Sequence, residues 1–259
     1  MLNAILYGKS GTASDGSNWR NLFHHSEDLL SAVVWTRISY LPYEWIVKLL
    51  TALYPKLSEH LKASGVFKNV EFWPLWTASV ESDQKRVEPD IVFHFEKLDI
   101  LIEAKRYDSV QQYPEQWMNQ IEAYRLKYPL GESKLLFCAI GGLGINPQKT
   151  IQNFTKVMNN RIKELPVIDG STWLHLMYVI SNLQTNKNMP VHCKRILKDI
   201  LKAMELNGFW KPSYLSDLKS YNLKSDSNKI FSLYPLLNSS YYSFYPVQIS
   251  NLSMKVFSK

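Results

Sequence analysis

The sequence predicts an α/β fold (α+β in its order of elements), with a mixed β-sheet flanked by helices. Three observations lead to this prediction. Helical periodicity dominates the first part of the 259-residue chain, strand-like runs follow, and a helix, a nearly continuous apolar strand and another helix come next. That order of elements is typical of a mixed sheet covered by helices.

Two helices are expected before the strands. Ser26 is a good N-cap, and two acidic residues follow it in the first turn of a helix over 27–41. The buried face of this helix should carry the residues that repeat every four positions, Leu30, Val34 and Ile38. Glu27 should lie at the edge of that face. The second helix, over 43–64, should kink near Pro55.

The later elements follow from changes in periodicity. They occupy the stretches 69–80, 90–95, 98–107, 114–128, 133–142, 147–165 and 190–208. The first three are strand-like, 133–142 is an apolar strand that suits a central position, and the others are amphipathic helices. No long linker separates these parts. We therefore interpret 1–259 as a single domain, with residues 181–259 as a C-terminal helical and aromatic extension packed on the core.

Composition favours a globular protein with a polyanionic partner. Hydrophobic residues make up 46% and charged residues 20% of the chain, which is enough for a sizeable core. The net charge of +7 suits nucleic acid. Cys138 and Cys193 show no metal-type or redox-type spacing, so we interpret them as free thiols of a reducing cytosol. We find neither a signal peptide nor an apolar run that could span a membrane, so we expect a cytoplasmic protein without a membrane partner.

The C-terminal part adds a basic stripe and an aromatic tail. Three lysines recur every four positions in the helix over 190–208, namely Lys194, Lys198 and Lys202. Such a stripe is either a solvated face or a track for a phosphate backbone. The tail from Phe209 is rich in Tyr, Ser, Phe and Leu, and it would serve as core, as an oligomer surface or as a stacking surface for a single strand.

The stretch EPDIVFHFEKLDILIEAKRY, over 88–107, contains the candidate chemistry. If its two strands form a hairpin with a loop of two or four residues, the numbers of paired residues sum to 193. Asp90 then faces Glu103 across the ribbon, with about 4.5 to 5.5 Å between Cβ atoms. Lys105 points to the same side, as does His94, for which we expect a surface role. A loop of three or five residues would shift the partners by one.

Two carboxylates in that geometry repel each other, so either one is protonated or a cation lies between them. Oxygen ligands suit Mg²⁺ or Mn²⁺ rather than zinc. Such an ion polarises a phosphoryl oxygen and activates water, and a neighbouring lysine can neutralise charge that develops on the phosphate. The pattern therefore predicts a phosphodiester hydrolase. The alternative is an exposed sheet face with a surface ion pair.

Pro89-Asp90, a spacer of twelve residues and Glu103-Ala104-Lys105 together resemble the signature of the PD-(D/E)XK nuclease superfamily. The resemblance covers roughly residues 24–145, inside a nuclease core that we expect over 24–180. It implies a restriction-endonuclease-like core, in which a mixed sheet is flanked by helices.

Two further matches support the resemblance. Gln120 and Tyr124 resemble the Gln-hydrophobic-x-x-Tyr motif of the RecB-like branch, and Glu27 lies where the superfamily often has an additional acid. The resemblance implies that Glu27 binds a second metal or a metal-bound water. Each residue also has a structural interpretation, as a helix-surface glutamine, a core tyrosine and a first-turn acid favoured by the helix dipole. Glu88 and Glu71 are alternatives to Glu27.

The resemblance also implies the roles of the other site residues. Mg²⁺ or Mn²⁺ would be held by Asp90, Glu103 and the carbonyl of Ala104. Lys105 would act on the attacking water or the transition state, and Gln120 would orient Lys105 or a phosphate. The candidate substrate-binding residues are Tyr124, Arg106, Lys194, Lys198 and Lys202.

The function that these expectations describe is a metal-dependent nuclease that cuts DNA rather than RNA. By analogy with the superfamily it would act in prokaryotic phage defence, restriction or repair. Its partners would be nucleic acid and either a second copy of the chain or another protein of a defence system. The alternative is a nuclease-like subunit that binds nucleic acid or joins an assembly without cutting.

Overall fold

The computed structural model of the protein describes residues 16, 18–77, 86–107, 109–129 and 133–210. The strands are β1 (Phe67–Phe72), β2 (Trp76–Thr77), β3 (Arg86–Val87), β4 (Ile91–Phe95), β5 (Leu98–Ala104), β6 (Lys134–Ile140) and β7 (Val167–Ser171). The helices are α2 (Trp19–His25), α3 (Glu27–Ser39), α4 (Tyr43–Leu53), the 3₁₀ turn η1 (Pro55–Leu57), α5 (Ser58–Lys62), α6 (Pro114–Lys127), α7 (Pro147–Asn159), α8 (Trp173–Gln184) and α9 (Val191–Leu206).

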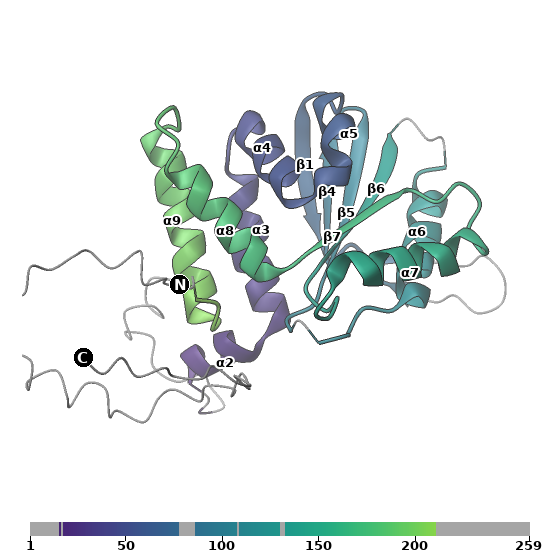
Figure 1. Ribbon diagram of the computed structural model, residues 1–259, viewed down its shortest axis with the longest axis horizontal. Helices are drawn as coiled ribbons and strands as arrows, with labels where there is room; N and C mark the ends of the chain where they lie inside the picture. Colours follow the sequence, from purple (N-terminus) through teal and green to yellow (C-terminus); the bar gives the residue numbers. More distant parts are fainter. Residues whose placement is uncertain (1–15, 17, 78–85, 108, 130–132, 211–259) are drawn as a thin grey trace, which may run out of the picture. The chain divides into compact units, whose positions relative to one another are not determined.

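The main sheet has five strands in the order β1-β4-β5-β6-β7 (Figure 1). Strands β1, β4 and β5 pair antiparallel, whereas β5, β6 and β7 pair parallel. Strands β2 and β3 form a separate two-stranded sheet. The predicted fold class, a mixed sheet flanked by helices, is therefore confirmed. The arrangement is consistent with the restriction-endonuclease-like core that the resemblance implied.

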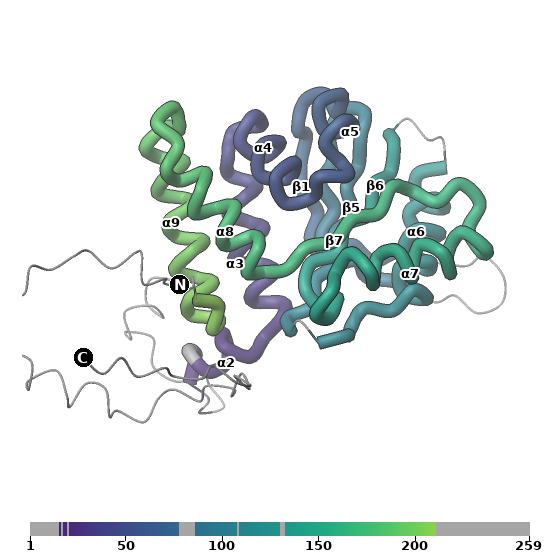
Figure 2. Tube along the Cα trace, in the orientation of Figure 1, coloured from purple at the N-terminus to yellow at the C-terminus, as the bar shows by residue number. Residues whose placement is uncertain are grey.

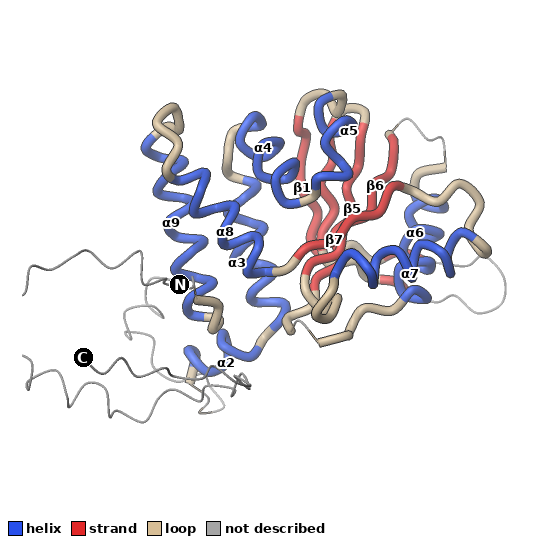
Figure 3. The backbone as a smooth tube through the Cα atoms, viewed as in Figure 1, coloured by secondary structure: helices blue, strands red, loops and turns tan. Residues whose placement is uncertain are grey.

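Helices cover both faces of this sheet (Figure 3). On one face, α3, α4, α8 and α9 enclose a core that includes Ile91, Phe93 and Ile102 from the central hairpin. On the other face, α6 and α7 pack over Val92 and Leu101. Because side chains alternate along a strand, the same hairpin supplies both cores. The face under α6 is the one that also carries Asp90, His94 and Glu103.

The first helices form as their sequence predicts. Ser26 caps α3 by accepting a hydrogen bond from the backbone N–H of Leu29, at 3.2 Å. The residues expected on its buried face, Leu30, Val34 and Ile38, have no exposed surface. The second helix breaks at Pro55, where α4 gives way to η1 and α5. Helix α9 packs against α3, although the two are far apart in the sequence (Figure 2).

The single strand predicted over 69–80 is wrong. Strand β1 ends at Phe72, and the next residue, Trp73, has a φ of +47°. A left-handed backbone conformation is unfavourable for a large side chain and interrupts the strand, and Pro74 follows it. Trp76 and Thr77 then pair with β3 rather than with the main sheet, and residues 78–80 lie outside the described part of the chain.

Four of the described elements were not predicted, namely α2, β3, β7 and α8. The sequence of β7, VIDGS, contains an Asp-Gly pair that suggests a turn, yet Asp169 is buried and accepts hydrogen bonds from the backbone N–H groups of Lys56 and Gly170, at 3.0 and 2.9 Å. A Cβ at Gly170 would lie 2.7 Å from Leu143, so the glycine serves close packing. Helix α7 is also shorter than expected and ends at Asn159.

Helix α9 corresponds to the helix predicted over 190–208, and it packs on α3 and α8. The aromatic tail beyond Trp210 lies outside the described residues. Among the helices that the structure describes, none is both long and apolar enough to cross a membrane.

Candidate active site

The register of the central hairpin is the one that the sequence predicts. Ile91 pairs with Ile102 and His94 with Asp99, so the numbers of paired residues sum to 193. Strand β4 begins directly after Asp90, which therefore lies across from Glu103 near the end of β5. The carboxylate of Asp90 accepts a hydrogen bond from the backbone N–H of Ala104, at 2.8 Å. The predicted register is confirmed, and both acids line one cavity.

Asp90 is in an unfavourable environment for a charged group. It is 8% exposed. Burial, followed by repulsion from Glu103, raises the pKa of Asp90 to about 8, and the hydrogen bond from Ala104 offsets this only in part. Near neutral pH the protonated form of Asp90 is therefore favoured, even though the charge of Lys105 acts in the opposite direction.

Glu103 is held by three hydrogen-bond donors. Its Oε1 accepts from Lys105 Nζ and from Gln116 Nε2, each at 2.6 Å, and its Oε2 accepts from Gln120 Nε2 at 2.6 Å. Gln120 thus contacts Glu103 rather than Lys105 directly, and its expected role in orienting Lys105 or a phosphate stays a prediction. The Oε1 of Gln120 is buried and has no hydrogen-bond partner among the described residues.

Lys105 lies among acidic groups, as the hairpin geometry predicts. Its Nζ is 2.6 Å from Glu103 Oε1, 3.3 Å from Glu27 Oε1 and 3.0 Å from the carbonyl oxygen of Ala104. Burial acts to lower the pKa of Lys105, but Glu103, Glu27 and Asp90 outweigh it and raise the pKa above its ordinary value. Lys105 is therefore a fixed cation near neutral pH.

Glu27 reaches the site from the first turn of α3. Besides its contact with Lys105, its Oε2 accepts a hydrogen bond from the backbone N–H of Arg106, at 2.8 Å. Glu27 therefore fixes the chain at the end of β5 and also contacts the Lys105 ammonium. Its proximity to the site agrees with the sequence-based expectation.

Two glycines allow the Lys105 segment to take this position. Gly141 and Gly142 follow β6 with φ values of +68° and +67°. A Cβ on Gly141 would lie 1.9 Å from the carbonyl oxygen of Lys105, and one on Gly142 would lie 2.6 Å from the Lys105 Cβ. The same carbonyl accepts a hydrogen bond from Trp173 Nε1, at 2.8 Å. The glycine pair thus serves close backbone approach to the site.

These groups open into a cavity of about 450 Å³, which we name the acid pocket. Its lining residues are Asp28, Trp73, Glu88, Asp90, Glu103, Lys105 and Gln116. The sequence did not single out Asp28, Trp73 or Gln116. Of these three, only Gln116 could have been predicted from the sequence, because it lies one helical turn before Gln120 and therefore shares its helix face. Glu88, considered as an alternative acid, does line the pocket.

Across the described residues, no group of three or more His, Cys, Asp and Glu side chains is placed to hold a metal ion. The Lys105 ammonium contacts the carboxylates of Glu103 and Glu27 and donates a hydrogen bond to the Ala104 carbonyl. The donor set nevertheless suits a hard cation. The carboxylates of Asp90 and Glu103 line the acid pocket and offer the oxygen ligands that such an ion prefers.

Tyr124 is not brought to the acid pocket. Its hydroxyl donates to Asp99 Oδ2 at 2.6 Å, and Asp99 precedes Glu103 by four residues, or about 13 Å along the strand. Tyr124 and Asp99 line a different cavity, of about 510 Å³, together with His94 and Tyr128. His94 is only 9% exposed, so its expected surface role is wrong.

The remaining candidates for substrate binding differ in position. Arg106 is 4% exposed, and its guanidinium donates to the side chain and the carbonyl of Asn207, at 3.2 and 2.6 Å. It therefore joins the end of α9 to the site segment, which corrects its predicted role in substrate binding. The lysine stripe lies on α9, outside the lining of the acid pocket. Lys198 is exposed, while Lys194 and Lys202 are half-buried.

Comparisons with known proteins establish kinship. No protein-family model matches the chain, and no solved structure matches it significantly. The chain is 30% identical over 217 residues, which is 80% of each protein, to "Uncharacterized protein PM0110" of Pasteurella multocida (strain Pm70). The chain therefore belongs to the same protein family as PM0110.

Proposed function

We propose that the protein is a metal-dependent nuclease of the PD-(D/E)XK type that hydrolyses phosphodiester bonds, in DNA rather than RNA. The observation that supports it most is the meeting of Asp90 and Glu103 from neighbouring strands, with Lys105 Nζ 2.6 Å from Glu103, in the wall of an open cavity. A buried, strongly perturbed carboxylate in a cleft is typical of a functional site. The net charge of +7 suits a polyanionic substrate.

The fit of a divalent cation rests on the acid pocket itself. Asp90, Glu103 and the Ala104 carbonyl would hold Mg²⁺ or Mn²⁺, since all three offer oxygen. Burial and repulsion from Glu103 raise the pKa of Asp90, and a bound cation would offset that repulsion. When bound, such an ion supplies Lewis-acid polarisation of a phosphoryl oxygen.

The protein's own groups divide the remaining work. Gln116 and Gln120 fix the orientation of Glu103, and Glu27 fixes the backbone beside Lys105. The Lys105 ammonium stabilises negative charge that develops on the phosphate during attack by water. To hold a cation, Asp90 would have to release the proton that its raised pKa of about 8 favours near neutral pH.

The experiment is a cleavage assay with single-stranded DNA, double-stranded DNA and RNA in Mg²⁺, in Mn²⁺ and in EDTA. We expect products from DNA with either metal and none in EDTA. Intact substrates under all conditions, at protein concentrations where nucleic acid is bound, would contradict the proposal.

One observation favours a second candidate, a nuclease-like subunit that binds nucleic acid without cutting. The Lys105 ammonium already contacts Glu103, Glu27 and the Ala104 carbonyl, which are the groups that a metal would need. If that arrangement persists in Mg²⁺, the acids serve to hold the lysine as a phosphate contact. Binding of DNA with a constant affinity in Mg²⁺ and EDTA, and no products, would favour this candidate.

A further inference from the structure

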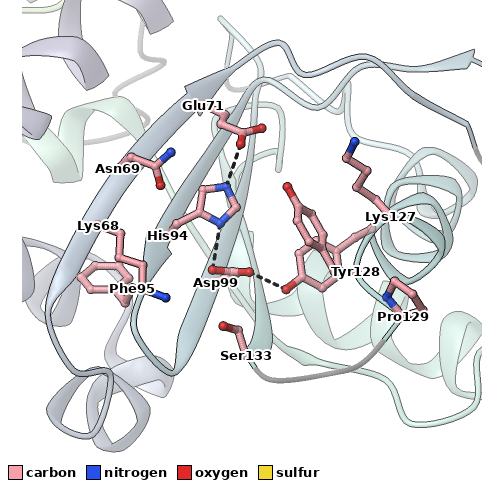
Figure 4. Close-up of a pocket in the computed structure, with 11 residues that line it drawn as sticks. Lys68, Asn69, Glu71, His94, Phe95, Asp99, Lys127, Tyr128, Pro129 and Ser133 are labelled. Carbon is pink, nitrogen blue, oxygen red and sulfur yellow. Dashed lines mark hydrogen bonds and ion pairs between the residues drawn. The ribbon is translucent and has the colours of Figure 1, made fainter.

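A second cavity, of about 510 Å³, is separate from the acid pocket, and we name it the His94 pocket. Figure 4 shows its two walls. One wall carries side chains from β1 and β4, including Lys68, Asn69, Glu71 and His94, and the other carries Lys127 and Tyr128 from the C-terminal end of α6. Its volume is in the range of cavities that hold small ligands.

His94 is fixed in this pocket by a chain of hydrogen bonds. Its Nδ1 is 2.9 Å from Asp99 Oδ1, and the other oxygen of Asp99 accepts from the hydroxyl of Tyr124 at 2.6 Å (Figure 4). An ionised carboxylate only accepts, so Asp99 places the ring hydrogen on Nδ1. Nε2 is then the nitrogen that remains for a ligand, and it is buried without a hydrogen-bond partner among the described residues.

Glu71 is the free acceptor of the pocket. Its Oε1 lies 3.5 Å from His94 Nε2, and its side chain is 39% exposed, so it remains accessible to donors from a ligand. Asp99 differs, because both of its oxygens are used by His94 and Tyr124. A ligand that enters the pocket therefore meets one carboxylate that still requires donors.

Lysines lie at the rim of the pocket on both walls. In β1 the register shifts between Phe67 and Asn69, so Lys68 is the extra residue of a β-bulge beside the edge of the sheet. Asn69 pairs with His94, which places its side chain next to the ring. Lys68 and Lys127 are both exposed. They are placed to meet phosphates outside the pocket.

Tyr128 supplies an aromatic wall. Its ring is half-buried, with its centroid 5.9 Å from that of His94 and 4.9 Å from that of Tyr124. These contacts hold the ring in place without covering it fully. A fixed, partly exposed tyrosine is a suitable platform for a stacked base.

We propose that the His94 pocket receives an unstacked nucleobase that carries an amino group. The base would stack on Tyr128 and donate one amino hydrogen to Glu71 and the other to His94 Nε2, while Lys68 and Lys127 bind the flanking phosphates. Carboxylates accept from the exocyclic amine of cytosine, and adenine and guanine also carry such an amine, whereas thymine and uracil do not. The inference rests on the proposed function in taking the ligand to be a nucleic acid, and it adds an unpaired strand as substrate.

The test measures binding in EDTA, so that it does not depend on cleavage. Labelled oligo(dC), oligo(dA) and oligo(dT) are titrated with the full chain and followed by fluorescence anisotropy. We expect oligo(dC) and oligo(dA) to bind about tenfold more tightly than oligo(dT). Glu71→Ala should abolish this preference. Glu122→Ala, which removes an exposed glutamate from α6 outside either pocket, should keep it and so controls for net charge.

A second variant tests the stacking platform. Tyr128→Leu keeps an apolar side chain but removes the ring, so it should weaken binding of all three oligonucleotides alike, by roughly tenfold. Competition by free cytidine monophosphate but not by thymidine monophosphate, without oligonucleotide binding, would assign the same chemistry to a free nucleotide. Equal affinity for the three oligonucleotides, or a preference that survives Glu71→Ala, would overturn the inference. Metal-dependent cleavage would then still support the proposed function.

Discussion

The acid pocket and the His94 pocket lie on the same face of the sheet, at opposite ends of the central hairpin, yet their charges are handled differently. In the His94 pocket, Asp99 is satisfied by two hydrogen bonds, at 2.9 and 2.6 Å. In the acid pocket, burial and repulsion from Glu103 raise the pKa of Asp90 to about 8, although the backbone N–H of Ala104 donates to it at 2.8 Å. Asp99 therefore belongs to a hydrogen-bonded network that satisfies both of its oxygens, whereas the surroundings of Asp90 disfavour its charged form.

Helix α6 links the two pockets through its spacing. Gln116 and Gln120 hold Glu103, and Tyr124, one turn further, holds Asp99. Residues four apart on a helix share a face, so one helix can fix acids at two points of one strand. The Gln-hydrophobic-x-x-Tyr spacing in this chain therefore serves both pockets rather than one.

The largest expected effect concerns the support of the acid pocket. In Gly141→Ala the new Cβ would lie 1.9 Å from the Lys105 carbonyl oxygen, at a φ of +68°. Backbone strain and overpacking together should lower the free energy of unfolding by about 4 kcal/mol, measured by urea denaturation. Gly144→Ala has a similar φ of +74°, but its nearest neighbour is the end of Val110 at 3.1 Å, so it should lose much less. Equal losses would show that contact with Lys105 is unimportant.

The next effect concerns the ion pair in the acid pocket. Lys105→Met leaves Glu103, which is 1% exposed, with only its two amide donors. Removing one partner of a buried pair should lower the free energy of unfolding by about 3 kcal/mol. Adding Glu103→Gln should restore part of that loss, because the unpaired charge disappears. A fully stable Lys105→Met variant would mean that water screens the pair.

A smaller loss is expected in the His94 pocket. Tyr124→Phe removes the hydroxyl that donates to Asp99 at 2.6 Å and leaves a buried carboxylate oxygen unpaired. The free energy of unfolding should fall by about 2 kcal/mol, as measured by thermal or urea denaturation. Cleavage per folded molecule should not change, since Tyr124 does not line the acid pocket. A selective loss of cleavage would instead place Tyr124 in the catalytic machinery.

The pH dependence of stability should distinguish the two pockets. The pKa of Asp90 is raised in the folded protein to about 8, so between its ordinary value near 4 and this value the folded state binds more protons than the unfolded state. Asp90 therefore makes stability fall as pH rises through that range. Asp90→Asn should remove this loss and be more stable than the parent at pH near 8 by about 1 kcal/mol or more. Parallel stability curves for the two proteins would contradict the assignment.

The smallest effect concerns the lysine stripe on α9. If Lys198 follows the phosphate backbone, Lys198→Ala should weaken binding of all sequences alike and reduce the salt slope of log affinity by about one. Anisotropy titrations over a range of salt concentrations measure this slope. An unchanged slope would identify the stripe as a solvated face.

The sequence predicted more of the acid pocket than of the His94 pocket. Asp90, Glu103 and Lys105 lie on one hairpin, where strand alternation fixes which side chains meet, so their proximity was predictable. The contacts of Tyr124 and Arg106 depend on how α6 and α9 pack, and no local pattern gives that. For the same reason the sequence did not show the His94 pocket, which brings together β1, the hairpin and the end of α6.

The fold shows the same limit. Strands β4, β5 and β6 have apolar runs and were predicted, whereas β7 contains Asp169 and Gly170, which suggest a turn. Asp169 is tolerated only because Lys56, distant in the sequence, supplies its backbone N–H and a charge at 3.8 Å. Nothing in the sequence predicted the positive φ of Trp73, and this residue lines the acid pocket.

The most direct measurement compares DNA cleavage in Mg²⁺ by matched variants of the two pockets. We predict that Asp90→Asn, folded and able to bind DNA, forms no products, while Glu71→Ala cuts at the parent rate per bound substrate. Cleavage by Asp90→Asn at the parent rate would contradict the assignment of the acid pocket as the catalytic centre.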